Sequence, residues 1–203
     1  MALSSEKRLG VVSPSRSFPK PTTMQTKLIS TLLLVAAATV SSIASAADGT
    51  ITFNGSVTAQ TCTINGNGSG SNNFSVTLLP VSTSALATAG QYAGRQGFSI
   101  ALTACTPASG NVHTYFEPGP TVDSATGNLI VATGGATNVE IGLLNSDYSR
   151  IQLGAPDASQ NSKSAAISAA GAATLNYYAQ YVATGAATAG AATSSVMYSL
   201  IYQ

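Results

Sequence analysis

Val196-Met197-Tyr198-Ser199-Leu200-Ile201-Tyr202-Gln203 closes the chain with the pattern of a β-strand. Successive side chains of a strand point to opposite faces of the sheet, so residues two apart share a face. In this stretch the residues that share a face are apolar or aromatic, and they are Val196, Tyr198, Leu200 and Tyr202. We therefore predict a final strand over Ser194–Tyr202 that has one apolar face.

A second alternating segment lies towards the other end and reads Ala47-Asp48-Gly49-Thr50-Ile51-Thr52-Phe53-Asn54-Gly55-Ser56-Val57. It predicts a strand over Thr50–Ala59, in which three apolar residues and one glycine share a face. These four residues are Ile51, Phe53, Gly55 and Val57. Asn-Gly is also the dipeptide that a type I′ hairpin turn prefers, so Asn54-Gly55 has a second interpretation as a turn between two short strands.

Between these segments the chain has the pattern of an all-β protein. Short alternating runs bounded by Gly, Asn, Asp and Pro recur, and no sustained helical period with caps occurs. Ala158–Thr174 is rich in Ala and Ser and has helical propensity, but Gly171 and the lack of a polar face favour a loop or an irregular strand. Ala183–Thr193 is expected to be a loop. The spacing of the strands predicts a β-sandwich, with further strands at Cys62–Ile64, Phe74–Leu79, Gly97–Thr103, Val112–Glu117, Leu129–Ala132, Val139–Leu144 and Leu175–Val182.

The first 46 residues have the pattern of a targeting segment. A short charged run, Met24–Lys27, precedes the apolar run Leu28–Val40, and Ala44-Ser45-Ala46 matches the cleavage pattern of signal peptidase. We expect a signal peptide over 24–46 and a non-native upstream extension over 1–23. The alternative is a membrane anchor, which the shortness of the apolar run disfavours, so no membrane span is expected in the mature form.

The composition of the mature chain excludes some partners. Cleavage after Ala46 leaves three basic residues, Arg95, Arg150 and Lys163, against six acidic ones, a net charge of about −3. Three scattered basic residues provide no electrostatic footprint for nucleic acid or for an anionic membrane surface. The remaining chain is long enough for one compact domain but not for two.

The two cysteines, Cys62 and Cys105, indicate a disulfide if the chain is exported, because an oxidising compartment favours pairing. Two free buried thiols are the alternative.

Residues capable of catalysis are scarce. His113 is the only histidine, and we expect it to be a surface or half-buried side chain of a strand. Glu117 and Asp123 flank a Pro-Gly-Pro turn, where solvated charges are far commoner than an acid–base pair. The acidic residues are too dispersed to predict a metal site, and no glycine-rich loop opens a helix to hold a phosphate. We therefore expect a structural or binding protein without a cofactor rather than an enzyme.

Four features together resemble the pilin subunits of chaperone–usher fimbriae, particularly the type 1 major pilin family, over 47–203. They are the alternating N-terminal segment with its glycine, the two cysteines about forty residues apart, the run Tyr177–Gly185, which is similar to the penultimate pilin strand, and the C-terminal strand. That strand has a penultimate tyrosine, and Gly190 stands fourteenth from the end, as in the family's C-terminal motif.

The resemblance implies an incomplete immunoglobulin-like β-sandwich that lacks its last strand, which a neighbouring subunit supplies by donor-strand exchange. Residues 47–59 would be the N-terminal extension that donates the strand, and 60–203 would be the pilin domain with a Cys62–Cys105 disulfide. The acceptor groove, also the contact surface for the chaperone, would involve Gly190, Val196, Tyr198, Leu200 and Tyr202.

The partners implied are identical or related pilin subunits, a periplasmic chaperone and an outer-membrane usher. The subunit would travel through the periplasm to a cell-surface fimbrium that supports adhesion. The alternatives are a minor adaptor subunit of the same pilus and a secreted carbohydrate-binding β-sandwich, and the second would need an exposed aromatic platform.

Overall fold

The computed structural model describes residues 50–55, 57 and 59–203. The expected upstream extension over 1–23, the signal peptide over 24–46 and residues 47–49, 56 and 58 of the N-terminal extension lie outside the described part, so those predictions stay predictions. The chain divides into two units between Thr52 and Phe53, and the fold below is that of Phe53–Gln203.

The larger sheet is built around two long strands, β2 (Tyr92–Thr106) and β8 (Ala173–Ala183), which pair antiparallel. Every odd-numbered side chain of β8 is buried, which is the alternation expected of a strand with one face on the core. Six strands make up this sheet, in the order β1 (Thr61–Gly66), β2, β8, β6 (Val139–Asn145), β5 (Asn128–Ile130) and β4 (Val122–Asp123).

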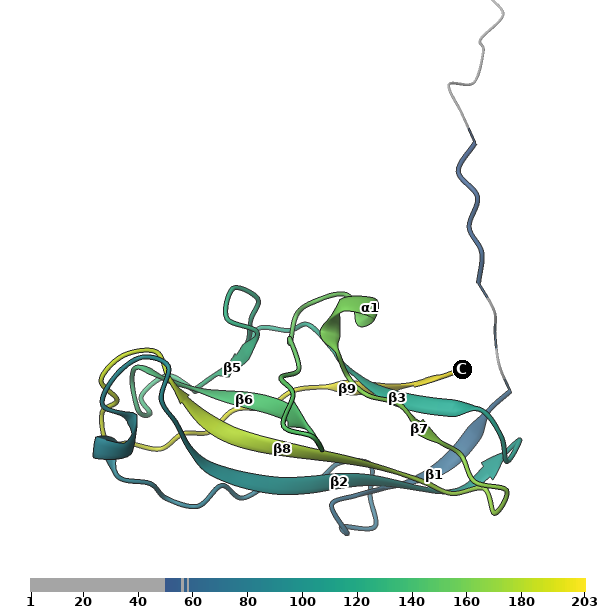
Figure 1. The fold of residues 1–203 in the computed structure, drawn as a ribbon, viewed down its shortest axis with the longest axis horizontal. Coiled ribbons are helices and arrows are strands. Elements are labelled where there is room, and N and C mark those ends of the chain that lie inside the picture. Colours follow the sequence, from purple (N-terminus) through teal and green to yellow (C-terminus); the bar gives the residue numbers. More distant parts are fainter. Residues whose placement is uncertain (1–49, 56, 58) are drawn as a thin grey trace, which may run out of the picture. The chain divides into compact units, whose positions relative to one another are not determined.

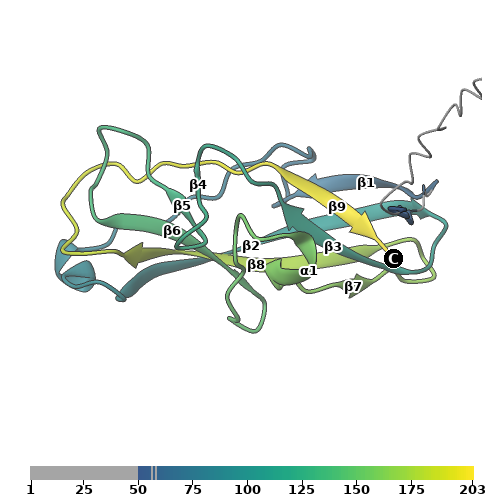
Figure 2. The same cartoon turned by 90° about the horizontal axis from the view of Figure 1, so that it is seen from above.

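The smaller sheet has three strands in the order β7 (Ala165–Ala166), β3 (Asn111–Phe116) and β9 (Tyr198–Tyr202). Figures 1 and 2 show β3 and β9 side by side over one face of the larger sheet. All strand pairs in both sheets are antiparallel, so the architecture is a β-sandwich. The prediction of an all-β sandwich from the sequence is confirmed.

Aromatic and aliphatic side chains from both sheets form the core between them. Tyr177 of β8 is 2% exposed, and its ring lies 5.5 Å from the ring of Phe98 and 5.5 Å from that of Phe116, centroid to centroid. Aromatic pairs at this separation stabilise a core beyond the apolar area that they bury. The core therefore joins β2 and β8 of the larger sheet to β3 of the smaller one.

Some predicted elements are wrong in extent. Ala158–Thr174 contains the end of a four-residue helix, α1 (Asp157–Gln160), the short strand β7 and the first residues of β8, so neither a continuous helix nor a simple loop is present. A 3₁₀ turn, η1 (Thr83–Leu86), and β4 were not predicted, because elements this short leave no periodic pattern.

Two predicted strands form no ladder. The described residues of Thr50–Ala59 pair with no strand, and Phe74–Leu79 is extended without one. In the second segment Phe74, Val76 and Leu78 are half-buried and alternate with exposed residues, so the strand pattern is present but the neighbouring strand is missing. The segment is therefore extended without a ladder to a described strand, and its Ser75 carbonyl accepts from Nδ2 of Asn67 at 3.3 Å.

Candidate functional site

The outer edge of β9 has no strand beside it among the described residues. Gln203 and Asn111 exchange both of their N–H···O bonds, each 2.8 Å from nitrogen to oxygen. In an antiparallel pair such residues alternate with residues whose N–H and C=O groups point the other way. The backbone groups that point away from β3, towards the unoccupied edge, therefore belong to Tyr198, Leu200 and Tyr202.

The same edge borders apolar side chains that the sandwich leaves partly uncovered. Several half-buried residues pack against the hydrophobic core from two extended segments, one before η1 and one at the end of the chain. We call the strip that these two segments border, which opens into a cavity at one end, the acceptor groove. Its one wall is made by Phe74, Val76, Leu78 and Val81 and the other by Val196, Tyr198, Leu200 and Tyr202. Unpaired backbone beside uncovered core is the combination that a further strand would satisfy.

The two walls touch at defined points. The hydroxyl of Tyr198 donates a 2.7 Å hydrogen bond to the carbonyl oxygen of Asn72, and the rings of Phe74 and Tyr198 are 6.1 Å apart. Further along, Leu78 and Val81 line one cavity together with Gly190 and Ala192. Along the first wall, from Asn72 to Val81, the contacting residues on the second wall run backwards from Tyr198 to Gly190. The two walls therefore run antiparallel.

A cavity of about 260 Å³ lies at the Gly190 end of the groove. Its lining is mostly aliphatic and includes Leu78, Val81, Leu86, Val139, Tyr181 and Ala192. Gly190 is needed here for backbone approach, because a Cβ on it would lie 2.6 Å from the amide nitrogen of Ala136. The cavity is large enough for a side chain from another segment.

The opposite edge of β3 is closed by side chains and by β7. The carboxamide of Gln160, fully buried in α1, accepts from the amide of Phe116 at 2.8 Å and donates to the Phe116 carbonyl at 2.9 Å. It thereby makes the two hydrogen bonds that a neighbouring strand would make. Sequence patterns did not single out Gln160, because the pairing depends on a contact across 44 residues.

His113 differs from the prediction of a surface or half-buried side chain. It is 6% exposed, and its Nε2 lies 2.8 Å from Oδ1 of Asp157. The pair fastens α1 onto β3, and a buried polar ring next to a carboxylate satisfies the hydrogen-bonding requirement of both. The residue therefore has a structural role that the β3 alternation alone did not indicate.

The N-terminal segment presents its apolar side chains to solvent. Ile51 is 79% exposed, Phe53 is 88% exposed and Val57 is 103% exposed. Gly55 does not lie in the left-handed region that a type I′ turn requires at its second central position, so the hairpin interpretation of Asn54-Gly55 is wrong. These three apolar side chains are therefore not covered by the described part of the chain.

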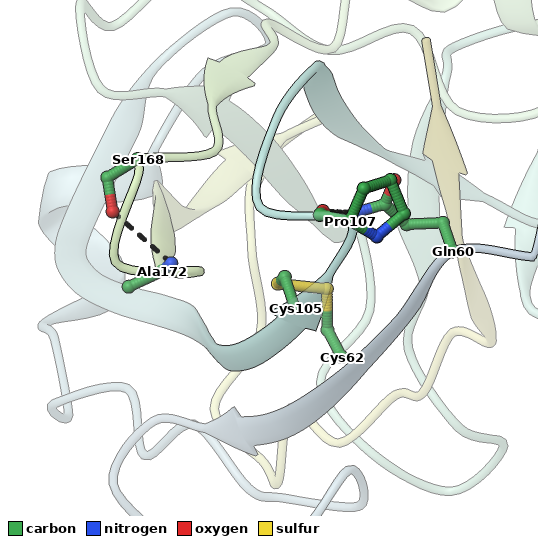
Figure 3. Close-up of a disulfide and its surroundings, with 6 residues drawn as sticks. All are labelled: Gln60, Cys62, Cys105, Pro107, Ser168 and Ala172. Atoms are coloured by element: carbon green, nitrogen blue, oxygen red, sulfur yellow. Dashed lines mark hydrogen bonds between the residues drawn. A yellow bond between two sulfur atoms is a disulfide. The ribbon is translucent and has the colours of Figure 1, made fainter.

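The chain leaves the sandwich at a covalently fixed point. Cys62 of β1 and Cys105 of β2 form the predicted disulfide, with their Cα atoms 4.1 Å apart (Figure 3). Next to it, Nε2 of Gln60 donates to the carbonyl of Pro107 at 2.6 Å (Figure 3). A cross-link across 43 residues stabilises a domain by about 4 kcal/mol in the chain-entropy description.

The ionisable groups of β9 and of the Pro-Gly-Pro turn each have a defined local environment. Burial raises the pKa of the Tyr198 and Tyr202 hydroxyls, so both stay neutral at physiological pH. Glu117 accepts a 2.5 Å hydrogen bond from the Ser199 hydroxyl, and Asp123 accepts from the amides of Ala125 and Thr126 in a turn. Both carboxylates therefore have local structural roles.

Among the described residues no cluster of three or more His, Cys, Asp or Glu side chains could hold a metal ion. No helix within residues 50–55, 57 and 59–203 is long and apolar enough to cross a bilayer.

The structure brings together most of the predicted acceptor residues. Tyr198, Leu200 and Tyr202 lie on β9, Val196 lies just before it, and Gly190 lines the cavity at the far end. The first wall of the groove, Phe74–Val81, was not predicted to take part, although the sequence predicts a strand over Phe74–Leu79. The sequence signal for this wall is an alternating apolar pattern that has no neighbouring strand in either sheet.

Comparison with known proteins gives consistent matches. Residues 78–203 match the family described as FimA: Type-1 fimbrial protein, A. The chain is 51% identical over 164 residues to the major fimbrial subunit SMF-1 of Stenotrophomonas maltophilia strain K279a, a match that covers 78% of this chain and 95% of that protein. It is 46% identical over 178 residues to the F17 fimbrial protein of Escherichia coli, covering 85% of this chain and 97% of that protein.

Among solved structures, the P pilus rod subunit PapA has a similar fold. The TM-score is 0.52 at 22% identity, and the match covers 70% of this chain and 99% of PapA.

Proposed function

Because the chain belongs to the type-1 fimbrial protein family and is a structural subunit of a fimbrium, we propose that it polymerises by donor-strand exchange. In this proposal residues 47–59 of one subunit fill the acceptor groove of the next. The main support for this proposal is that the edge of β9 is unpaired and lies beside partly uncovered core side chains. The same chain also has an exposed segment with alternating apolar residues.

Donor and acceptor have matching patterns. Residues 51–57 place a side chain or a glycine on one face at four alternate positions, and residues 196–202 do the same on the groove wall. Each stretch spans about 20 Å as an extended chain, so one can run along the other for its whole length. Strand addition of this kind takes affinity from main-chain hydrogen bonds and specificity from alternate side chains, and chaperone–pilin complementation is a known example.

The energies support association. Burying the side chains of Ile51, Phe53 and Val57 would contribute about 5–9 kcal/mol before the cost of ordering the strand. The backbone groups of Tyr198, Leu200 and Tyr202 would gain partners at the same time. Gly55 carries no side chain and suits a shallow point of the groove.

Before assembly, the groove needs a temporary occupant, since an apolar strip beside a free sheet edge promotes aggregation. We propose that a periplasmic chaperone fills it, and that an outer-membrane usher is the place where the next subunit's extension replaces the chaperone. The terminal carboxylate of Gln203 is proposed to bind basic residues of the chaperone. The assembled fimbrium is proposed to support adhesion.

A truncation tests the exchange directly. A mature chain that lacks Ala47–Ser56 is expected to stay bound to its chaperone and to add no subunits, as measured by electron microscopy of surface fibres and by recovery of the chaperone complex. The control replaces Thr52 and Asn54, on the opposite face of the segment, with alanine and should assemble. Normal fibres from the truncated chain would overturn the proposal.

A minor adaptor role is the second candidate, and the 30% identity to the minor fimbrial subunit HifD of Haemophilus influenzae is the observation that supports it. The higher identity to a major subunit favours a repeating role. Counting copies of the chain along purified fibres distinguishes the two, since an adaptor occurs once or a few times per fibre and a repeating subunit occurs throughout. The family is a structural one, and we propose no catalytic activity.

A further inference from the structure

A second hollow lies on the outer face of the larger sheet, away from the core. Its volume is about 230 Å³, and we call it the outer basin, lined mainly by Tyr92, Arg95, Asn128, Tyr148, Arg150 and Gln180. Even-numbered residues of β6 and β8, such as Gly142 and Gln180, contribute to it, whereas the odd-numbered residues of both strands face the core. The outer basin is therefore separate from the acceptor groove.

Two of the three basic residues of 50–203 meet in this basin. Nε of Arg95 donates to Oε1 of Gln180 at 3.0 Å, and Nη2 of Arg150 donates to Oδ1 of Asn128 at 3.1 Å. Both amides are at least nine-tenths buried, so they hold the guanidinium groups in place. Neither arginine forms an ion pair with a carboxylate of the described residues, and Glu140 is instead bonded to Asn128.

The backbone is shaped to aim these side chains. Arg95 lies in a β-bulge of β2, where the register shifts between Ala93 and Gln96 and Gly94 has a φ of 64°. A bulge re-aims a side chain and is over-represented next to functional sites. Tyr148 has a φ of 65°, a conformation that a bulky residue rarely adopts.

Aromatic rings form one wall of the basin. Tyr92 is 59% exposed and Tyr148 is 53% exposed, and the guanidinium carbon of Arg95 lies 4.4 Å from the centroid of the Tyr148 ring. Tyr178 supports that ring from behind, 4.9 Å away between centroids. The floor stays open because Gly142 has no side chain; a Cβ there would lie 2.9 Å from Val182 and 3.2 Å from Oδ1 of Asn128.

We propose that the outer basin binds an acidic saccharide, a sugar unit that carries a carboxylate or sulfate group. Guanidinium groups without a carboxylate partner can donate to carboxylate or sulfate oxygens in their fork geometry. The exposed ring of Tyr92 can pack on the apolar side of a sugar ring, while the Tyr148 ring holds Arg95 beside it. The volume is below the range of about 300–1,000 Å³ typical of enclosed ligand pockets, which suits one unit of a longer chain lying on an open surface. Repeated along a fimbrium, weak sites of this kind would add up by multivalency.

Purified wild-type fibres test this with three fluorescent oligosaccharides of equal length: a uronate-containing hyaluronan fragment, a sulfated heparin fragment and a neutral chitin fragment. Fluorescence polarisation should show that at least one acidic fragment binds about tenfold or more tightly than the neutral one. The two acidic arms show whether a carboxylate alone suffices or sulfate groups strengthen binding further. Equal binding of acidic and neutral fragments overturns the proposal.

Variants then locate the site. Arg95→Gln and Arg150→Gln should each weaken acidic-fragment binding by about tenfold, and Tyr148→Ser should weaken it as well. Lys163→Gln is the matched control, because Lys163 is paired with Asp147, whose pKa it holds below the usual range by hydrogen bonding. It should change affinity by less than about twofold. Thermal unfolding of the variant fibres verifies that they remain assembled.

Two further results would overturn the proposal. If sodium sulfate displaces the acidic fragment as well as unlabelled fragment does, at ionic strength matched with sodium chloride, the basin holds any anion rather than a saccharide. If the arginine variants keep full saccharide affinity but change the sedimentation or diameter of the fibres, the basin is a contact between subunits. The truncation of Ala47–Ser56 tests donor-strand exchange and not saccharide binding, because the outer basin shares no residue with the acceptor groove. The two proposals can therefore fail independently.

Discussion

In the proposed donor segment, Gly55 is the one position on the inserting face that carries no side chain. A leucine at this position would add a branched side chain to the face that also carries Phe53 and Val57. We expect Gly55→Leu to block insertion into the acceptor groove, so that fibre length by electron microscopy falls and chaperone-bound subunit accumulates.

The control is Asn54→Leu, which adds the same side chain on the opposite face and should leave assembly intact. Unimpaired polymerisation of Gly55→Leu would show that the donor register is misassigned.

Gly190 has a different requirement, since its own backbone packs against another loop. An added Cβ would lie 2.6 Å from the Ala136 nitrogen and 2.9 Å from the carbonyl carbon of Gly135. We expect Gly190→Ala to lower the free energy of unfolding by about 1–3 kcal/mol, measured by urea titration of the self-complemented chain described below.

Gly119→Ala is the matched control for this change. A Cβ on Gly119 would meet no atom within 4 Å, so its effect should stay within about 0.5 kcal/mol. A similar loss in both variants would mean that close backbone approach at Gly190 is not the cause.

At the scale of elements, the donor-strand proposal requires β9 to accept a further strand. Leu200 is half-buried on the groove wall, whereas Met197, just before β9, is 69% exposed. We expect Leu200→Asp to weaken binding of a synthetic 47–59 peptide to a chain without its own extension by about tenfold or more, because a buried leucine contributes about 1.5–3 kcal/mol.

Met197→Asp introduces the same charge on the exposed side and should bind the peptide nearly as well as the unsubstituted chain. Calorimetric titration of the peptide compares the two, and equal losses would indicate a general effect of charge rather than contact along the groove.

The predicted elements were most accurate where the alternation was long. β3, β6 and β8 match their predicted ranges closely, and the burial of β8 alternates as its sequence predicts, whereas β6 is buried at every position. β4, β7 and α1 were missed because two to four residues hold no period. Phe74–Leu79 has a strand pattern but pairs with no strand of the described residues.

For the whole molecule, the proposal means that one subunit is incomplete and two are needed for a full sandwich. A chain that starts at Gln60 and carries residues 50–59 after Gln203 through a short flexible linker should complete itself. We expect it to be monomeric by size-exclusion chromatography with light scattering, and to fold without a chaperone.

The same chain with Ile51→Asp and Phe53→Asp in the appended segment is the control and should aggregate or remain chaperone-dependent. A self-complemented chain that aggregates as readily as this control would contradict the assignment of donor and acceptor.

The sequence by itself determined the all-β class, the disulfide pair and the two alternating apolar faces, because period-two burial and cysteine pairing are local or compositional properties. Only the tertiary structure decided that Phe74–Val81 walls the groove, that Gln160 and the His113–Asp157 pair close the β3 side, and that two arginines share one basin. These contacts join residues tens of positions apart, and which pairs meet depends on how the sheets pack. The final strand depends on both: its alternation predicted a strand over Ser194–Tyr202 with one apolar face, and the structure forms it over Tyr198–Tyr202, paired with β3 on one side and with no described strand on the other.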